Sequence, residues 1–260
     1  MGVQKETNVD ASGRNSESHG HAVIDGHVHL GGAPERHGSP AEVFALLETI
    51  EAACAVCLPA PGVEPDNAEL ERLVKPHRDR LFPCVWVNPL IGSRAVETVD
   101  KYAKAGWRAL KLQPAMHQFP LISGDVFAVV EVALRHRMMV IIHTGGSPTA
   151  SPWAVGELAI RYPDARIVVD HMGGADMEYV NAAMVMAERH PGLFLGTSQM
   201  PFYRKYQEAV ARIGADRLIF GSDAPVVHPL PEFQRVRVAG FSRADEAKIF
   251  GANLAKLLAV

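Results

Sequence analysis

The feature that most constrains the fold is an alternation of two kinds of segment. From residue 22 onward, short apolar runs alternate with segments of helical periodicity, and the pattern repeats eight times. The runs are nearly continuous in apolarity, which is typical of strands buried on both faces. The predicted strands are Ala22–Asp25, Ala53–Leu58, Leu81–Val87, Trp107–Leu112, Met138–Ile142, Arg166–Asp170, Leu193–Thr197 and Leu218–Phe220.

The segments between these runs carry helix start signals. Ser39 precedes a proline at the first helical position and a Glu at residue 42 that can close a capping box. Ser151 precedes another proline, and Ser242 with Asp245 begins the last pair of helices. Strands and helices therefore alternate along the whole of this region.

Strand–helix alternation folds either as a closed barrel or as an open doubly wound sheet. An open sheet that binds nucleotides carries a G-x-G-x-x-G turn after its first strand, and Gly31-Gly32 does not match that pattern. We therefore predict an α/β fold, a (β/α)8 TIM barrel, as a single domain over residues 21–260. Residues 1–20 are polar and almost free of large apolar side chains, which predicts a disordered leader.

Composition excludes several classes of partner. The formal net charge is -3 and no basic stretch stands out, so we expect no nucleic acid partner. No segment has enough consecutive apolar residues for a bilayer, so we expect no membrane partner. Cys54 and Cys57 form a C-x-x-C without a second pair, and with Cys84 they predict reduced buried thiols in a cytoplasmic protein.

Polar residues gather where the predicted strands end. Chemistry in such a barrel takes place at the carboxyl ends of its strands, so these residues are expected at one rim. His27 and His29 are two residues apart, so both imidazoles project to the same side of a strand and suit Zn²⁺ or a similar cation. A barrel brings His143, at the end of the fifth run, and Asp223, after the eighth, to the same mouth.

Lys111 lies in the middle of the fourth run, between Leu110 and Leu112. Its side chain points either into the barrel or outward beneath a helix. An inward ammonium requires a partner, a metal link or a chemical modification, whereas an outward lysine extends past the helix to solvent. Strand periodicity leaves both orientations open.

Five motifs in this order resemble the amidohydrolase superfamily. The likeness is to its single-domain branch, which includes aminocarboxymuconate-semialdehyde decarboxylase, and extends from about residue 22 to the C-terminus. The motifs are Ile24-Asp25-Gly26-His27-Val28-His29-Leu30, Ala109-Leu110-Lys111-Leu112-Gln113-Pro114, Ile142-His143-Thr144-Gly145, Asp170-His171-Met172-Gly173-Gly174 and Phe220-Gly221-Ser222-Asp223-Ala224-Pro225.

The resemblance implies a role for each of these polar residues. It implies that His27, His29, His143 and Asp223 bind one divalent metal ion, zinc or manganese. His171 and Asp223 are the implied catalytic residues, which move protons. A second metal is expected only if Lys111 is carboxylated. Candidate substrate-binding residues are Lys111, Gln113, Asn88 and His228, and weaker candidates are Arg36, His37, Trp86 and His117.

Three functions are compatible with these motifs. The first is hydrolysis of an ester, lactone or amide bond in a small carboxylated molecule by a metal-activated water. The second is non-oxidative decarboxylation of a small unsaturated or aromatic acid. The third is an inactive barrel used for binding, which predicts a broken metal set. A homodimer is also compatible, with Met177, Tyr179, Met184 and Met186 either on an exposed patch or on the core face of their helix.

Overall fold

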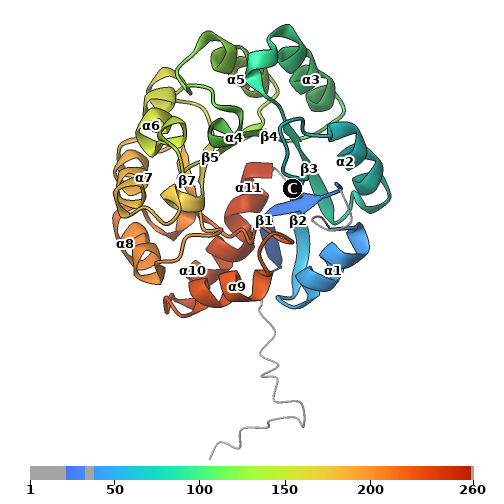
Figure 1. Ribbon diagram of the computed structural model, residues 1–260. Coiled ribbons are helices and arrows are strands. Elements are labelled where there is room, and N and C mark those ends of the chain that lie inside the picture. The colour runs from blue at the N-terminus through green and yellow to red at the C-terminus, as the bar shows by residue number, and fades with distance from the viewer. Residues whose placement is uncertain (1–21, 33–37, 259–260) are drawn as a thin grey trace, which may run out of the picture.

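The structure is a computed structural model that describes residues 22–32 and 38–258 (Figure 1). The predicted leader, Arg36 and His37 lie outside the described residues. Eight strands follow the chain in order. They are β1 (Val23–Leu30), β2 (Ala52–Pro59), β3 (Leu81–Trp86), β4 (Ala109–Leu112), β5 (Met139–His143), β6 (Ile167–Asp170), β7 (Leu193–Gly196) and β8 (Leu218–Ile219).

The strands form one parallel sheet in the order β1 to β8. Its two ends meet through backbone hydrogen bonds: the amide of Gly26 donates to the carbonyl of Phe220 at 2.9 Å, and the amide of Asp223 donates to that of His27 at 2.8 Å. The sheet is thereby nearly closed, and the predicted (β/α)8 TIM barrel is confirmed.

Helices surround the strands on the outside of the barrel (Figure 1). No helix among the described residues is long and apolar enough to cross a membrane. The α-helices are α1 (Pro40–Glu48), α2 (Asn67–Val74), α3 (Ser93–Lys104), α4 (Pro114–His117), α5 (Gly124–Arg135), α6 (Pro152–Arg161), α7 (Met177–Arg189), α8 (Tyr203–Ile213), α9 (Pro229–Arg237), α10 (Arg243–Ala247) and α11 (Asn253–Leu258). Short helical turns are η1 (Lys75–His77), η2 (Pro89–Ile91), η3 (Pro148–Ala150), η4 (His171–Gly173), η5 (Ala215–Arg217) and the π-helical η6 (Lys248–Ala252).

The predicted helix starts are confirmed at their caps. The Ser39 hydroxyl accepts from the amide of Glu42, whose carboxylate accepts in return from the amide of Ser39. The Ser151 hydroxyl accepts from the amide of Trp153 and caps α6, and the Ser242 hydroxyl accepts from the amide of Asp245 and caps α10. Each cap satisfies amide donors that the first turn of a helix leaves free, and so fixes where the helix leaves the rim.

The barrel interior has an apolar layer towards the amino ends of the strands, which we call the apolar interior layer. Leu254 and Leu257 of α11 pack against it, so the C-terminal helix closes that end of the barrel. Figure 1 shows α11 over the centre of the ring of strands. The strand residues of the apolar interior layer are Ile24, Val56, Cys84, Ala109, Met139, Val168 and Ile219.

The first strand extends further than its apolar run predicts. It continues to Leu30, five residues beyond the predicted end at Asp25, because the segment through His29 still pairs with β2. A register shift between Asp25 and Val28 interrupts this pairing. His27 and His29 therefore stand on a strand rather than on the loop after it.

Two side-chain predictions on the outer layers are also resolved. Met184 and Met186 are buried on the core face of α7, whereas Met177 is exposed. The two buried methionines therefore belong to the core and not to an exposed patch. The three cysteines are free thiols; Cys57 and Cys84 are buried as predicted, whereas Cys54 is only partly buried.

Candidate active site

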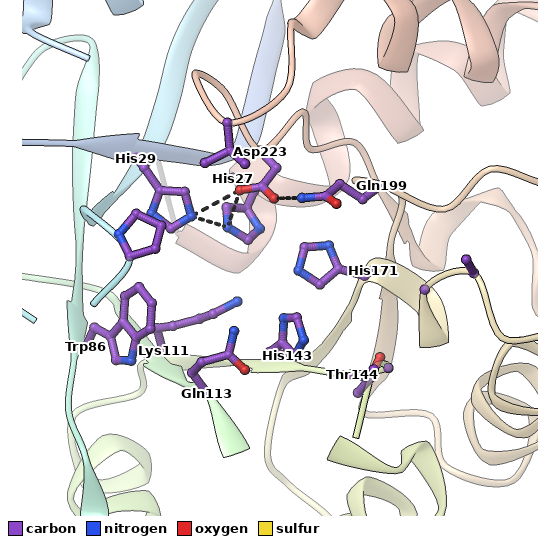
Figure 2. A pocket seen from close by; sticks show the side chains of 16 residues that line it. His27, His29, Trp86, Lys111, Gln113, His143, Thr144, His171, Gln199 and Asp223 are labelled. Atoms are coloured by element: carbon purple, nitrogen blue, oxygen red, sulfur yellow. Dashed lines mark hydrogen bonds and ion pairs between the residues drawn. The ribbon is translucent and has the colours of Figure 1, made fainter. Parts of the chain in front are cut away.

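A pocket of about 340 Å³ opens at the carboxyl ends of the strands (Figure 2). It collects most of the residues that the sequence pattern assigns to one rim. The predicted site residues that line it are His27, His29, Lys111, Gln113, His143, His171 and Asp223, together with Trp86.

Asp25 and Gly26 hold β1 close to the segment around β8, next to the site. The Asp25 carboxylate accepts from the amides of His27 at 3.1 Å and Ser222 at 2.9 Å, which joins β1 to the segment after β8. Burial raises the pKa of Asp25 to about 6, although those hydrogen bonds oppose the rise. A Cβ at Gly26 would lie 2.7 Å from the carbonyl oxygen of Phe220, so only glycine permits this approach.

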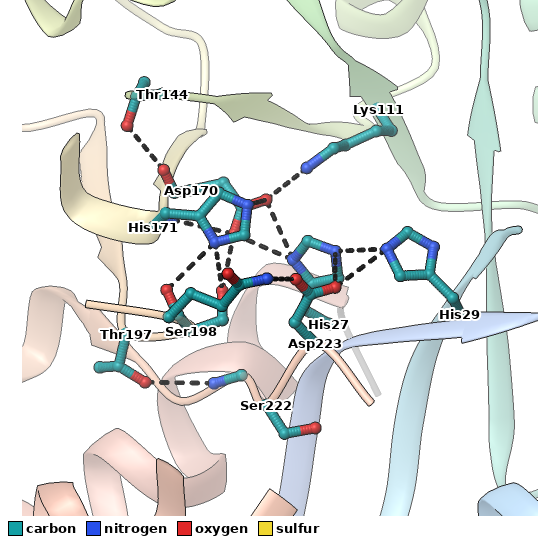
Figure 3. A network of polar contacts seen from close by, with 12 residues as sticks. His27, His29, Lys111, Thr144, Asp170, His171, Thr197, Ser198, Ser222 and Asp223 are labelled. Carbon is teal, nitrogen blue, oxygen red and sulfur yellow. Dashed lines mark hydrogen bonds and ion pairs between the residues drawn. The ribbon is translucent and has the colours of Figure 1, made fainter. Parts of the chain in front are cut away.

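Three potential metal ligands converge at the end of this motif. The Nε2 atoms of His27 and His29 are 3.1 Å apart. Oδ1 of Asp223 lies 3.3 Å from the first and 3.0 Å from the second. All three side chains are buried, and their ligand atoms form one compact group (Figure 3).

The remaining ring nitrogens show that this group fits a cation. Nδ1 of His29 lies 2.7 Å from the carbonyl oxygen of Pro59, which only accepts, so Nδ1 carries the proton. Nδ1 of His27 faces the Asp170 carboxylate at 3.0 Å and donates in the same way. With the proton on Nδ1, each Nε2 presents a lone pair, and the two Nε2 atoms face each other and a carboxylate oxygen. A divalent cation satisfies three such acceptors at once.

Asp223 is held by a second contact on its other oxygen. Gln199 donates its side-chain amide to Oδ2, and the backbone amide of Gln199 donates to the Glu232 carboxylate at 2.9 Å. Burial by itself raises the pKa of Asp223, but the neighbouring His27 and His29 hold it well below its ordinary value. Asp223 is therefore an ionised carboxylate that is fixed in orientation.

His171 stands beside this group, with its ring 5.3 Å from that of His27. Its Nδ1 lies 3.1 Å from the backbone carbonyl of Ser198, so that nitrogen carries the proton. Its Nε2 is left as an acceptor in the neutral ring. Burial lowers the pKa of His171, while Asp170 raises it.

His143 lines the pocket but does not belong to the compact group. Its ring contacts that of His171, with centroids 4.7 Å apart. Burial, together with His171 and Lys111, lowers its pKa to about 2, so the ring is neutral. Among residues 22–32 and 38–258 its side chain makes no hydrogen bond, which leaves both ring nitrogens free for a ligand. Its assignment as a metal ligand stays a prediction.

The orientation of Lys111 is resolved by the structure. The side chain points into the barrel and is 1% exposed, and its ammonium forms an ion pair with the Asp170 carboxylate. An inward lysine without a partner would be costly, and Asp170 is that partner. The ammonium is thus paired with Asp170 while the side chain also lines the pocket, and its assignment as a substrate-binding residue stays a prediction.

The remaining substrate-binding candidates separate into two sets. Gln113 lines the pocket, and its side-chain oxygen and Nε1 of Trp86 are buried without hydrogen-bond partners among the described residues. Asn88 and His228 are absent from the described pocket lining. Asn88 accepts from the amide of Leu90 to cap η2, and His228 caps α9 at the amide of Leu230. Both are helix caps in this structure.

Three functional contacts escape the sequence patterns. Asp170 lies within a recognised motif, but its partners Lys111 and His27 are 59 and 143 residues away. Ser198 holds His171 through its backbone carbonyl, which no side-chain pattern reveals. Gln199 follows the seventh strand with a left-handed φ of 54°, and its side-chain amide donates to Asp223. The sequence signal for Ser198 and Gln199 is their position as a polar pair directly after the predicted seventh strand.

Sequence comparison settles the family. A family model described as Amidohydrolase matches residues 24–260, which include every motif of the site. The chain belongs to the amidohydrolase family. This amidohydrolase is therefore an enzyme of the superfamily that its motifs resemble. No curated protein sequence matches it at a significant level.

Solved structures share the barrel of this amidohydrolase. A 5-carboxyvanillate decarboxylase from Novosphingobium aromaticivorans, with bound manganese, superposes with a TM-score of 0.75 at 13% identity over 94% of this chain and 98% of that one. A probable 2-pyrone-4,6-dicarboxylic acid hydrolase from Acinetobacter baumannii gives 0.72 at 16% over 92% and 99%. A 2,6-dihydroxybenzoate decarboxylase from Rhizobium gives 0.68 at 15% over 92% and 99%. At these identities the similarity shows the fold.

Proposed function

We propose that this amidohydrolase is a metal-dependent hydrolase that cleaves an ester, lactone or amide bond in a small molecule. Its metal ligands are His27, His29 and Asp223, with His143 as a further ligand from β5. The metal is zinc or manganese. When bound, such a cation supplies Lewis-acid polarisation of a carbonyl oxygen and promotes ionisation of water.

The observation that carries hydrolysis is the placement of two proton acceptors on one wall of the pocket. Asp223 is a carboxylate whose Oδ1 faces Nε2 of His27 and of His29 and has no hydrogen-bond donor among the described residues. His171 donates through Nδ1 to Ser198 and keeps Nε2 as an acceptor. When water attacks a carbonyl, a group must first accept a proton from the water, and only later must an acid protonate the leaving group. We assign to Asp223 the removal of the proton from the attacking water.

The proton that Asp223 removes from the water then passes to Nε2 of His171, and His171 delivers it to the leaving group. Its ring is anchored by Ser198 and reaches the same pocket as Asp223. Gln113 and Trp86 offer unpartnered polar atoms to the non-reacting part of the substrate. Lys111 is the only Lys or Arg in the described pocket lining, and its ammonium is paired with Asp170. This favours a substrate whose non-reacting part is polar and uncharged.

Decarboxylation of a small unsaturated or aromatic acid is the second candidate. It is supported by the decarboxylases that share this barrel, one of them with bound manganese. A decarboxylase needs an acid that protonates the carbon after the carboxylate leaves. The described pocket lining offers two proton acceptors, Asp223 and His171, and these suit hydrolysis better than they suit protonation of a carbon atom.

One assay separates the two functions. Metal-reconstituted protein is incubated with a panel of small esters, lactones, amides and aromatic acids, and both new carboxylate and released carbon dioxide are measured. We expect new carboxylate from a neutral substrate, dependence on added metal, and strongly reduced turnover by the Asp223→Asn variant. Release of carbon dioxide from an aromatic acid, lost in the same variant, would establish the decarboxylase instead.

A further inference from the structure

The turn after β7 brings Gln199 to Asp223, and we call residues 197–200 the Gln199 turn. Figure 2 shows Gln199 at the pocket with its side-chain amide donating to Oδ2 of Asp223. The backbone of Gln199 has a left-handed φ of 54°, a conformation that residues other than glycine adopt only at a cost. Such a conformation persists where surrounding contacts hold it in place.

Helix α8 and strand β8 hold the ends of the Gln199 turn. The buried hydroxyl of Tyr206 lies 2.9 Å from the carbonyl oxygen of Thr197 and 2.8 Å from that of Met200. The amide of Thr197 donates to the carbonyl of Ile219 at 3.0 Å, which ties the start of the turn to β8. These contacts fix both ends of the turn and leave the amide of Gln199 to a different partner.

That partner is Glu232 of α9. Oε2 of its carboxylate accepts from the backbone amide of Gln199 at 2.9 Å, and Oε1 pairs with the guanidinium of Arg235 at 2.6 Å. Glu232 is 4% exposed, and acidic side chains are rarely buried so deeply unless they are paired. Glu232 does not belong to the described pocket lining, so its link to the site runs through Gln199.

We propose that Glu232 is a positioning residue that acts on Asp223 through Gln199. This inference rests on the proposed role of Asp223 as a metal ligand. Oδ1 of Asp223 faces the two metal-binding histidines, while Oδ2 accepts from Gln199. Rotation of this carboxylate would therefore break one contact or the other. Partners that hold a metal ligand in orientation strengthen metal binding, and Glu232 holds the backbone that carries this partner.

Substitution of Glu232 tests the proposal by metal affinity. Glu232→Met removes both acceptor oxygens and keeps an unbranched side chain of similar length. We expect the Kd for Mn²⁺ to rise on the order of 10-fold, the lower end of the effect usual for partners of metal ligands. Isothermal titration calorimetry on chelator-treated full-length protein measures it. Glu232→Gln keeps an acceptor oxygen for Gln199, and Arg235, 25% exposed, can turn towards solvent. This variant should therefore recover most of the affinity.

A double variant tests whether Glu232 acts through Gln199. Gln199→Met removes the donor to Asp223 and should weaken Mn²⁺ binding by itself. Glu232→Met/Gln199→Met should bind no more weakly than the weaker single variant, because both changes remove one shared contact. Two independent effects would instead multiply, to about 100-fold.

Glu246 provides the matched control. It lies on α10 and pairs with Arg237 of α9 at 3.3 Å, so Glu246→Met removes an ion pair from the same helix. We expect the Kd for Mn²⁺ to stay at the wild-type value in this variant. The comparison separates the contact with Gln199 from a general loosening of α9.

Nuclear magnetic resonance of the metal-free protein tests the same link without a metal. The side-chain N–H signals of Gln199 are assigned by their absence in Gln199→Met. They should be shifted downfield by the Asp223 carboxylate in the wild type and in Glu232→Gln. We expect Glu232→Met to lose this shift.

Three results overturn the inference. The first is a folded Glu232→Met variant that keeps both the wild-type Kd and the wild-type Gln199 signals. The second is a double variant whose two effects multiply. The third is a wild-type Kd in Gln199→Met, which decides the question even if Glu232→Met does not fold, because Gln199 is exposed. A wild type that binds no Mn²⁺ refutes the proposed metal site, and the Gln199 signals of the metal-free protein then decide whether Glu232 positions the Asp223 carboxylate.

Discussion

The two ends of the barrel interior are built from the same strands but are stabilised by different interactions. Ala109 and Lys111 are two residues apart on β4, and Val168 and Asp170 are two apart on β6. The first of each pair lies in the apolar interior layer, and the second lies at the rim. We call the buried polar set at the carboxyl end the polar rim: His27, His29, Lys111, Asp170, His171 and Asp223.

The difference shows how function is placed on a stable scaffold. The apolar interior layer excludes water and is closed by α11, so it gains free energy from burial and shape alone. The polar rim is equally buried, but each charge must find a partner. Asp170 is satisfied within the protein, whereas the lone pairs of His27, His29 and Asp223 require a cation. A change at the polar rim is therefore expected to alter stability, metal binding and catalysis together.

The largest expected effect comes from the acceptor at the rim. Asp223→Asn keeps the size of the side chain and an oxygen for Gln199, but it removes the negative charge. We expect kcat to fall by about 10²–10⁴-fold, the usual contribution of a positioned general base. Steady-state kinetics on metal-reconstituted protein measures it. Unchanged circular dichroism would show that the fold survives, and kcat within a few-fold of wild type would remove Asp223 from the mechanism.

The second effect concerns the ion pair that lies just above the apolar interior layer. Asp170→Asn leaves the Lys111 ammonium buried without its counter-charge, and breaking a buried pair costs about 3–5 kcal/mol. Urea unfolding of the metal-free protein measures the loss. The double variant Lys111→Met/Asp170→Asn should recover most of this free energy, because it removes both charges. A single variant as stable as wild type would show that Lys111 has another partner.

The third effect is a loss of stability without a loss of chemistry. Leu257→Ala removes apolar contacts at the closed end of the barrel, where Leu257 is 4% exposed. Truncation of a buried leucine costs about 3 kcal/mol in free energy of unfolding. We expect kcat per folded molecule to stay at the wild-type value, measured well below the melting temperature. A parallel fall in kcat would mean that α11 also positions the rim.

The same comparison explains what the sequence could reveal. Apolar runs and helix caps depend on neighbours within a few residues, so the eight strands, the barrel and the capping box at Ser39 were predictable. The two-residue spacing of His27 and His29 likewise placed both rings on one side. Lys111 was not predictable, because both faces of β4 are buried and periodicity does not separate interior from exterior.

The sequence leaves the direction of a strand-end side chain open, because local turns and distant partners decide it. Asn88 and His228 follow strands as site residues do, but each turns back to the amide two residues ahead and caps a helix. Asp170 looks like an ordinary strand-end acid until His27 and Lys111 arrive from distant strands. Strand-end position predicts which rim a residue reaches. Whether its side chain then faces the pocket depends on the local turn.

The smallest effect uses the metal itself to test whether the two ends are independent. A ligand that binds only the folded state stabilises it by about 2.7 kcal/mol at a concentration near 100 times its Kd. Addition of Mn²⁺ to chelator-treated protein should therefore raise the free energy of unfolding by about that amount. Because distant sites contribute additively, the Leu257→Ala variant should gain as much as the wild type. The His29→Ala variant should gain little, since it lacks a ligand. If Leu257→Ala also loses the response to metal, the apolar end and the polar rim do not act independently. Packing in the apolar interior layer would then be needed to position the polar rim.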